Sequence, residues 1–237
     1  MTKILGRNGL KRKALGKLFI SAYFIIAAVE IIAEYFDDTV LIYLFKPLIM
    51  PALVIAYWNV SKVKNILYII SLLLSMVASI FFVSRNLQSI LVGAIFFFFH
   101  RVLIIQIVLK HIKLPSVFPM VVGCIPFLFA YMYLIIMTYD RIGSGIVIFV
   151  VQCLVISFLG GLSVGNFVLR SSKANTLLLF STLLHATTQF IFVLKLYYSE
   201  ITMFQPIAMI LFVTAQFLFF RFLLLAEKKR AGFKIRL

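Results

Sequence analysis

Residues 88–109 read QSILVGAIFFFFHRVLIIQIVL, and this stretch decides the class of fold. A helix that crosses a bilayer needs about 20 consecutive residues that are mostly apolar, and a run of this length exceeds what the core of a soluble domain normally uses. The run also contains two ionisable side chains, His100 and Arg101, directly after four phenylalanines. The sequence therefore predicts a transmembrane helix that carries polar groups at bilayer depth.

Seven further stretches of the same kind accompany it. The chain has 237 residues, of which 64% are hydrophobic and 13% charged, whereas about a quarter are charged in a typical soluble domain. The predicted spans are about 18–36, 40–58, 65–84, 88–109, 115–137, 143–168, 174–197 and 202–225. We expect an all-α integral membrane protein, a bundle of about eight transmembrane helices over 18–225. A basic segment (1–17) and a basic tail (226–237) flank this domain.

Lysine and arginine gather on alternate sides of the predicted spans. One set of loops holds Lys62, Lys64, Lys110, Lys113, Arg170 and Lys173, and both tails are basic as well. The opposite loops hold Glu34, Asp37, Asp38, Arg85, Asp140, Arg141 and Glu200. Because basic loops stay on the cytoplasmic side, we expect both termini to be cytoplasmic in the inner or an equivalent cell membrane.

The net charge of +16 would suggest a nucleic-acid partner for a soluble protein. Here the charge serves as an orientation signal, so we expect no nucleic-acid binding. The basic termini are expected to contact anionic lipid head groups instead. Ser157, Gly161 and Gly165 are spaced four residues apart and form a small-residue face that lets a neighbouring helix approach closely. Packing within the chain is the expected use of this face, with a homodimer as the alternative.

Ionisable residues at bilayer depth are costly and are candidates for function. A rise of about 1.5 Å per residue places Glu30, His100, His185 and Gln216 near mid-membrane and Lys46, Ser79 and Thr188 in the outer half. As the one acidic side chain expected near mid-depth, Glu30 should pair with Lys46 or Arg101. His185, Thr188 and Gln189 share one helix face, which suits a proton relay or a head-group site, or a hydrogen-bond cluster that holds the bundle together.

The sequence has no HExxH zinc motif and no phosphate-binding loop. Its three histidines, of which His111 is predicted in a loop, do not form a convincing metal site. We therefore expect neither a metal nor a cofactor.

Four short segments resemble the YhhN-type lysoplasmalogenase family of eight-helix membrane proteins. They are FKPLIMPAL at 45–53, LLLSMVASIFF at 72–82, GAIFFFFHRVL at 93–103 and TAQFLFF at 214–220. The family usually has an aspartate in the third helix and another in the seventh. In this chain the corresponding positions are Ser79 and Thr188.

The resemblance implies a hydrolase that cleaves the vinyl-ether bond of lysoplasmalogen to a fatty aldehyde and a glycerophospho head group. Such chemistry needs an acid and a base. With both aspartates replaced, Glu30, His100 and His185 are the candidate catalytic residues. The candidate substrate-binding residues are Lys46, Ser79, Arg101, Thr188, Gln189 and Gln216. The alternatives are a protein that binds a lysolipid or similar amphiphile without hydrolysing it, and a transporter or scaffold.

Overall fold

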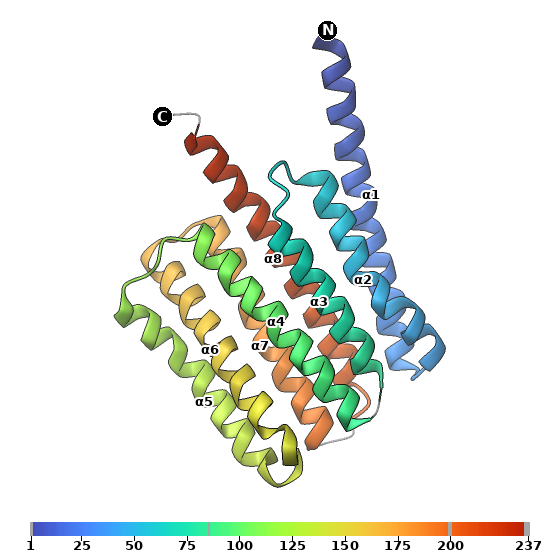
Figure 1. Cartoon of the computed structure of the whole chain (residues 1–237), viewed down its shortest axis with the longest axis vertical. Coiled ribbons are helices and arrows are strands. Elements are labelled where there is room, and N and C mark those ends of the chain that lie inside the picture. The colour runs from blue at the N-terminus through green and yellow to red at the C-terminus, as the bar shows by residue number, and fades with distance from the viewer. Residues whose placement is uncertain (1, 85, 199–200, 235–237) are drawn as a thin grey trace. The chain divides into compact units, whose positions relative to one another are not determined.

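The computed structural model describes residues 2–84, 86–198 and 201–234. Within them the chain forms eight α-helices and one short 3-10 turn, without strands (Figure 1). The helices are α1 (Thr2–Tyr35), α2 (Thr39–Val60), α3 (Ile66–Val83), α4 (Leu87–His111), α5 (Val117–Ile142), α6 (Ile146–Leu169), α7 (Lys173–Tyr197) and α8 (Phe204–Lys234), with the turn η1 at Gly143–Gly145. Each of the eight helices contains a segment long and apolar enough to cross a membrane. The chain is a multi-pass membrane protein, and the predicted all-α class and spans are confirmed.

The connection between α5 and α6 is shorter than predicted, because polar residues continue α5. Glu34 lies in α1 rather than in a loop, and Asp140 and Arg141 lie in the last turn of α5. A helix satisfies its own backbone near the bilayer, and α5 ends at Ile142, where Gly143 caps it with a φ of 55°. The loop residues Arg85 and Glu200 fall outside the described residues. The cytoplasmic placement of both termini stays a prediction.

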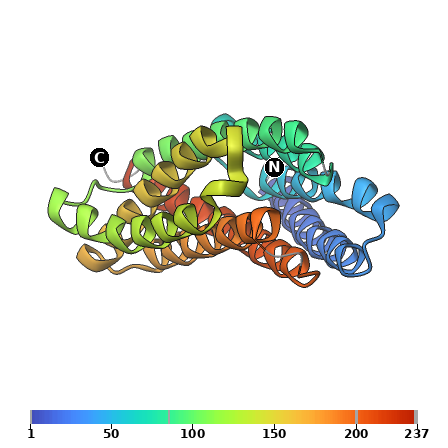
Figure 2. The same ribbon diagram turned by 90° about the horizontal axis from the view of Figure 1, so that it is seen from below.

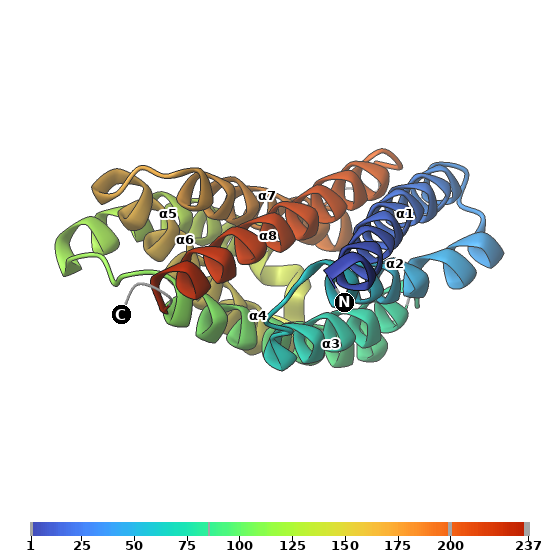
Figure 3. The same ribbon diagram turned by 90° about the horizontal axis from the view of Figure 1, so that it is seen from above.

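The first compact unit comprises Met1–His100. In it α1 packs along α2, and α2 packs against α3 (Figures 1 and 3). The Asp38 carboxylate accepts a hydrogen bond from the Leu41 amide at 3.1 Å and caps the start of α2. Asn65 caps α3 in the same way, through the amide of Leu67 at 3.1 Å. These caps fix where α2 and α3 begin, and therefore which of their residues face inward.

The second compact unit comprises Arg101–Leu237. It contains two helical hairpins, α5 with α6 and α7 with α8, and α7 also packs against both α5 and α6 (Figure 2). Its interior is dense in aromatic side chains, and Phe219, Phe220 and Phe222 of α8 are each at most 2% exposed. Ser181 of α7 donates a hydrogen bond to the Ala215 carbonyl of α8 at 2.8 Å. Apolar packing and hydrogen bonds between helices therefore hold this unit together.

The small-residue face of α6 packs on α5 within the chain. A Cβ atom added at Gly161 would lie 2.5 Å from the carbonyl oxygen of Met120, and one at Gly165 would lie 3.1 Å from Pro115. At Gly160 the added atom would lie 2.5 Å from the ring of Phe127. Glycine is required here because the two helix backbones approach too closely for a side chain. The expected packing within the chain is confirmed.

We expect Gly161→Ala to destabilise the protein by about 1–3 kcal/mol, the usual cost of overpacking a close contact. Thermal unfolding of the detergent-purified protein would show this as a lower midpoint. The matched control is Gly232→Ala in α8, where an added Cβ meets no described atom within 4 Å. If the two variants unfolded at the same temperature, the close contact between α5 and α6 would be wrong.

Candidate functional site

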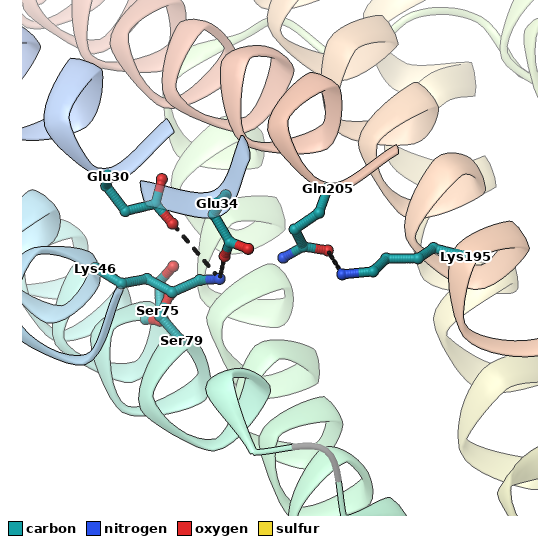
Figure 4. Close-up of polar contacts among 7 residues, drawn as sticks. All are labelled: Glu30, Glu34, Lys46, Ser75, Ser79, Lys195 and Gln205. Carbon is teal, nitrogen blue, oxygen red and sulfur yellow. Dashed lines mark hydrogen bonds and ion pairs between the residues drawn. The ribbon is translucent and has the colours of Figure 1, made fainter. Parts of the chain in front are cut away.

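Three charged side chains meet between α1 and α2. Nζ of Lys46 forms an ion pair with Oε1 of Glu30 at 3.5 Å and donates a hydrogen bond to Oε1 of Glu34 (Figure 4). The side chain of Lys46 is 5% exposed, that of Glu30 is 0% exposed and that of Glu34 is 7% exposed. We call Glu30, Glu34 and Lys46 the acid–lysine cluster. Of the two pairings predicted for Glu30, the structure shows the one with Lys46.

The cluster forms where the buried faces of α1 and α2 pack against each other. On α1 this face contains Tyr23, Ala27, Glu30 and Glu34, and on α2 it contains Ile42, Lys46, Ile49 and Leu53. Each set follows the spacing i, i+4, i+7, i+11, which places all four side chains on one side of a helix. The charged residues therefore occupy positions that would otherwise hold apolar core side chains.

Hydroxyl groups of α3 accompany the cluster. Ser75 and Ser79 lie beside Lys46 in Figure 4, and α3 packs against the helix that carries Lys46. Oγ of Ser79 donates to the Ser75 carbonyl at 2.9 Å. Among the described residues, neither Oγ of Ser75 nor either carboxylate oxygen of Glu30 has a hydrogen-bond partner. Buried polar atoms are normally hydrogen-bonded. The lack of hydrogen bonds at these buried oxygen atoms therefore marks the cluster as a candidate site.

His100 lies in the same unit on α4 and is 1% exposed. Its Nδ1 lies 2.7 Å from the carbonyl oxygen of Ser71 on α3, and its ring stacks on Phe97 with 5.2 Å between centroids. Since a carbonyl oxygen can only accept, this contact requires the proton of the imidazole to be on Nδ1. The observed contacts of His100 are thus structural ones.

A second polar group, the arginine–glutamine node, lies in the second unit. One guanidinium nitrogen of Arg101 on α4 donates to Oε1 of Gln152 on α6 at 3.0 Å and to Oε1 of Gln189 on α7. The three residues are 3%, 5% and 9% exposed. Glu30 was predicted as a possible partner of Arg101, and here two amide oxygens contact it instead. Gln152 was missed, although an amide within the apolar run IVIFVVQCLVISF is itself a signal.

The other predicted residues of this unit make contacts on α7 and α8. The ring of His185 lies edge-on to Phe212 with 6.0 Å between centroids. Thr188 donates from Oγ1 to the Leu184 carbonyl at 2.8 Å, and Gln216 is fully buried. Lys195 of α7 donates to Oε1 of Gln205 on α8 at 3.0 Å (Figure 4). The predicted site residues thus fall into two groups, one in each unit.

A model of the YhhN family matches residues 41–223, which reach from α2 to α8 and make up most of the chain. The chain belongs to the YhhN family. The match includes Lys46 but begins after Glu30 and Glu34, so the carboxyl groups of the cluster come from a helix that precedes it. Neither the curated proteins nor the solved structures contain a match to this chain.

This YhhN protein holds hydroxyl groups at the two positions where the resemblance led us to expect aspartates. Ser79 and Thr188 each donate their hydroxyl hydrogen to a carbonyl oxygen of their own helix. A hydroxyl engaged in this way neither supplies a proton nor carries charge. Neither hydroxyl group therefore takes the place of an acidic side chain, whereas the acid–lysine cluster contains two carboxyl groups.

We expect Arg101→Met to destabilise this YhhN protein by about 1.5–3 kcal/mol, because hydrogen bonds to charged groups contribute that much. The substitution removes the charged donor from the amide oxygens of Gln152 and Gln189. The control is Arg221→Met, an identical change at an exposed position of α8. Equal unfolding free energies for the two variants, measured by denaturation in detergent, would contradict the stabilising role of the node.

Proposed function

We propose that this YhhN protein hydrolyses the vinyl-ether bond of a lysolipid of the lysoplasmalogen type, with Glu30 as the acid. Family membership and the resemblance support this class of substrate. The observation that carries the proposal is the acid–lysine cluster, where one ammonium group lies against two buried carboxyl groups. A carboxyl group kept away from water is suited to general acid catalysis, because it can hold a proton at neutral pH.

The proposed reaction needs one proton and one water molecule. Glu30 gives its proton to the outer carbon of the vinyl group, which leaves an oxocarbenium ion at the carbon bonded to oxygen. Water adds to that carbon while the Glu30 carboxylate takes up the proton of the water. The resulting hemiacetal breaks into a fatty aldehyde and the free glycerophospho alcohol. Glu30 ends the cycle protonated, as it began.

His100 and His185 are alternative proton donors in this proposal. His100 already directs Nδ1 at the Ser71 carbonyl, and His185 lies against the ring of Phe212. Both contacts have a structural use, which is why Glu30 is preferred. If His100→Gln or His185→Gln abolished hydrolysis in a folded protein while Glu30→Gln did not, the assignment of the acid would move to that histidine.

Binding of a lysolipid without hydrolysis is the second candidate function. It is favoured by Ser79 and Thr188, whose hydroxyl groups donate to their own helices at the positions of the family's aspartates. This alternative predicts that lysolipid is co-purified with the protein and detected by mass spectrometry. Lys46→Ala should then reduce the amount of bound lipid, since Lys46 is the cation of the cluster.

The test of the proposal is aldehyde release from a vinyl-ether lysolipid by the purified full-length protein in detergent. We expect release above that of a mock purification from cells with an empty vector. The matched control substrate is the saturated alkyl-ether lysolipid, which has no double bond to protonate and should give no aldehyde. No aldehyde above the mock level would overturn the proposed hydrolysis, and co-purified lysolipid would then favour binding.

A further inference from the structure

The turn that joins α2 to α3, residues 61–65, lies beside α1 on the side toward the N-terminus (Figure 1). The contact with α1 is close, because a Cβ atom added at Gly16 would clash with Cγ2 of Val60. The segments apolar enough to cross the membrane begin at Ala14 in α1 and end at Val60 in α2. The turn therefore lies where the spans of this unit end, at the level of the lipid head groups.

Side-chain hydrogen bonds fix the shape of this turn. Oγ of Ser61 accepts hydrogen bonds from the amides of Val63 and Lys64, both at 3.1 Å. The amide of Asn65 donates to the phenolic oxygen of Tyr57 at 2.8 Å. The φ of Lys64 is 53°, in the left-handed region where glycine is less strained than any other residue. A lysine at such a position indicates that its side chain has a use.

The side chain of Lys64 lies against the single tryptophan of the chain. Its Nζ is 4.1 Å from the centroid of the Trp58 ring, which is a cation–π contact. Trp58 is 44% exposed and lies in the last turn of α2, and tryptophan is enriched at this level of membrane proteins. An ammonium group has three donors, so the contact holds Lys64 in place and still leaves donors for a second partner.

Three positive charges lie at this end of the unit without a carboxylate to pair with them. Lys17 and Lys62 are exposed and Lys64 is half-buried, and no described carboxyl group forms an ion pair with any of the three. The acidic residues of the unit all lie within 30–38. The first of them, Glu30, is about 20 Å from Lys17 along α1 at 1.5 Å per residue. This surface therefore fits a partner that brings its own negative charge.

We propose that Lys64 and Trp58, with Lys62 and Lys17, bind the phosphate group of an anionic phospholipid. Lys64 donates to the phosphate, while the Trp58 ring keeps the ammonium at the height of the head groups. Lys62 and Lys17 add an attraction that depends on the net negative charge of the lipid. The sequence predicted such contacts for the basic termini and not for this turn. The lipid site is separate from the proposed hydrolysis and does not depend on it.

Tryptophan fluorescence tests this site, because Trp58 is the single tryptophan of the chain. The full-length protein is reconstituted into vesicles of equal parts phosphatidylcholine and phosphatidylglycerol, with bromine on the acyl chains of one lipid or of the other. Bromine quenches tryptophan fluorescence at short range. We expect brominated phosphatidylglycerol to quench more strongly, because the anionic lipid gathers at the site. The depth of the ring affects both measurements equally, so their ratio reports the preference between the lipids.

Lys64→Met should reduce this preference by about fivefold, the effect of one lysine close to an anionic surface. Lys64→Arg should retain it, since a guanidinium group also stacks on an aromatic ring and binds phosphate. The matched control is Lys173→Met, which removes an exposed lysine at the start of α7 and should leave the preference unchanged. Each variant is compared as folded protein, checked by size-exclusion chromatography. Equal quenching by the two lipids in the wild type, or a preference that survives Lys64→Met, would overturn the lipid site.

Discussion

Replacing Lys46 with methionine should reduce the free energy of unfolding by about 3–5 kcal/mol, the usual cost of removing one partner from a buried ion pair. The cost arises because Glu30 and Glu34 remain in the interior after their cation is gone. Methionine is similar in length to the lysine stem, so the packing against α1 is nearly preserved. Chemical denaturation in detergent, followed by circular dichroism, measures the change.

Two further variants distinguish electrostatics from packing. Lys46→Met combined with Glu30→Gln and Glu34→Gln has no charge left in the cluster and should recover most of the lost stability, because neutral amides replace the carboxyl groups that Lys46 contacted. Lys110→Met, at the exposed end of α4, is the control for the substitution itself. A triple variant no more stable than Lys46→Met alone would show that the ion pairs are not what stabilises this contact.

Glu30→Gln should lower the rate of aldehyde release by about 10²–10⁴-fold, the range that a general acid contributes. Glutamine has the size of glutamate but no transferable proton. It should leave the fold intact, because a neutral amide of the same size replaces a protonated, uncharged carboxyl group. The activity of equal amounts of folded wild type and variant, checked by size-exclusion chromatography, provides the comparison.

The control for that comparison is Glu227→Gln, since Glu227 is a buried carboxyl group of α8 outside the cluster. We expect it to retain the wild-type rate. Equal rates for Glu30→Gln and wild type would remove Glu30 from the mechanism, even if the protein remained an active hydrolase.

The helices of this protein could be predicted from the sequence because apolar length alone decides whether a segment spans a bilayer. Which side of each helix faces inward could not. Lipid tails are as apolar as leucine, so the lipid-facing side of α1 is apolar too. Hydropathy therefore does not distinguish it from the face that carries Tyr23, Ala27, Glu30 and Glu34. Which face of α1 points inward is shown only by its packing against α2 in the structure.

Part of the candidate site could be predicted from the sequence. A lysine and a glutamate at bilayer depth must be neutralised, which made the pairing of Glu30 and Lys46 foreseeable. Glu34 was grouped with the loop charges, although the predicted span 18–36 includes it, because it lies near the end of the apolar run. Gln152 carries no charge, so a search for ionisable residues at bilayer depth does not find it.

The most direct test of the central claim, acid-catalysed cleavage of a vinyl ether, is to run the reaction in deuterium oxide. The released aldehyde would be trapped at once as its oxime and weighed by mass spectrometry. Because the acid delivers its proton to carbon, the account predicts one deuterium on the carbon next to the carbonyl group. Aldehyde without deuterium at that carbon, or no aldehyde at all, would contradict it.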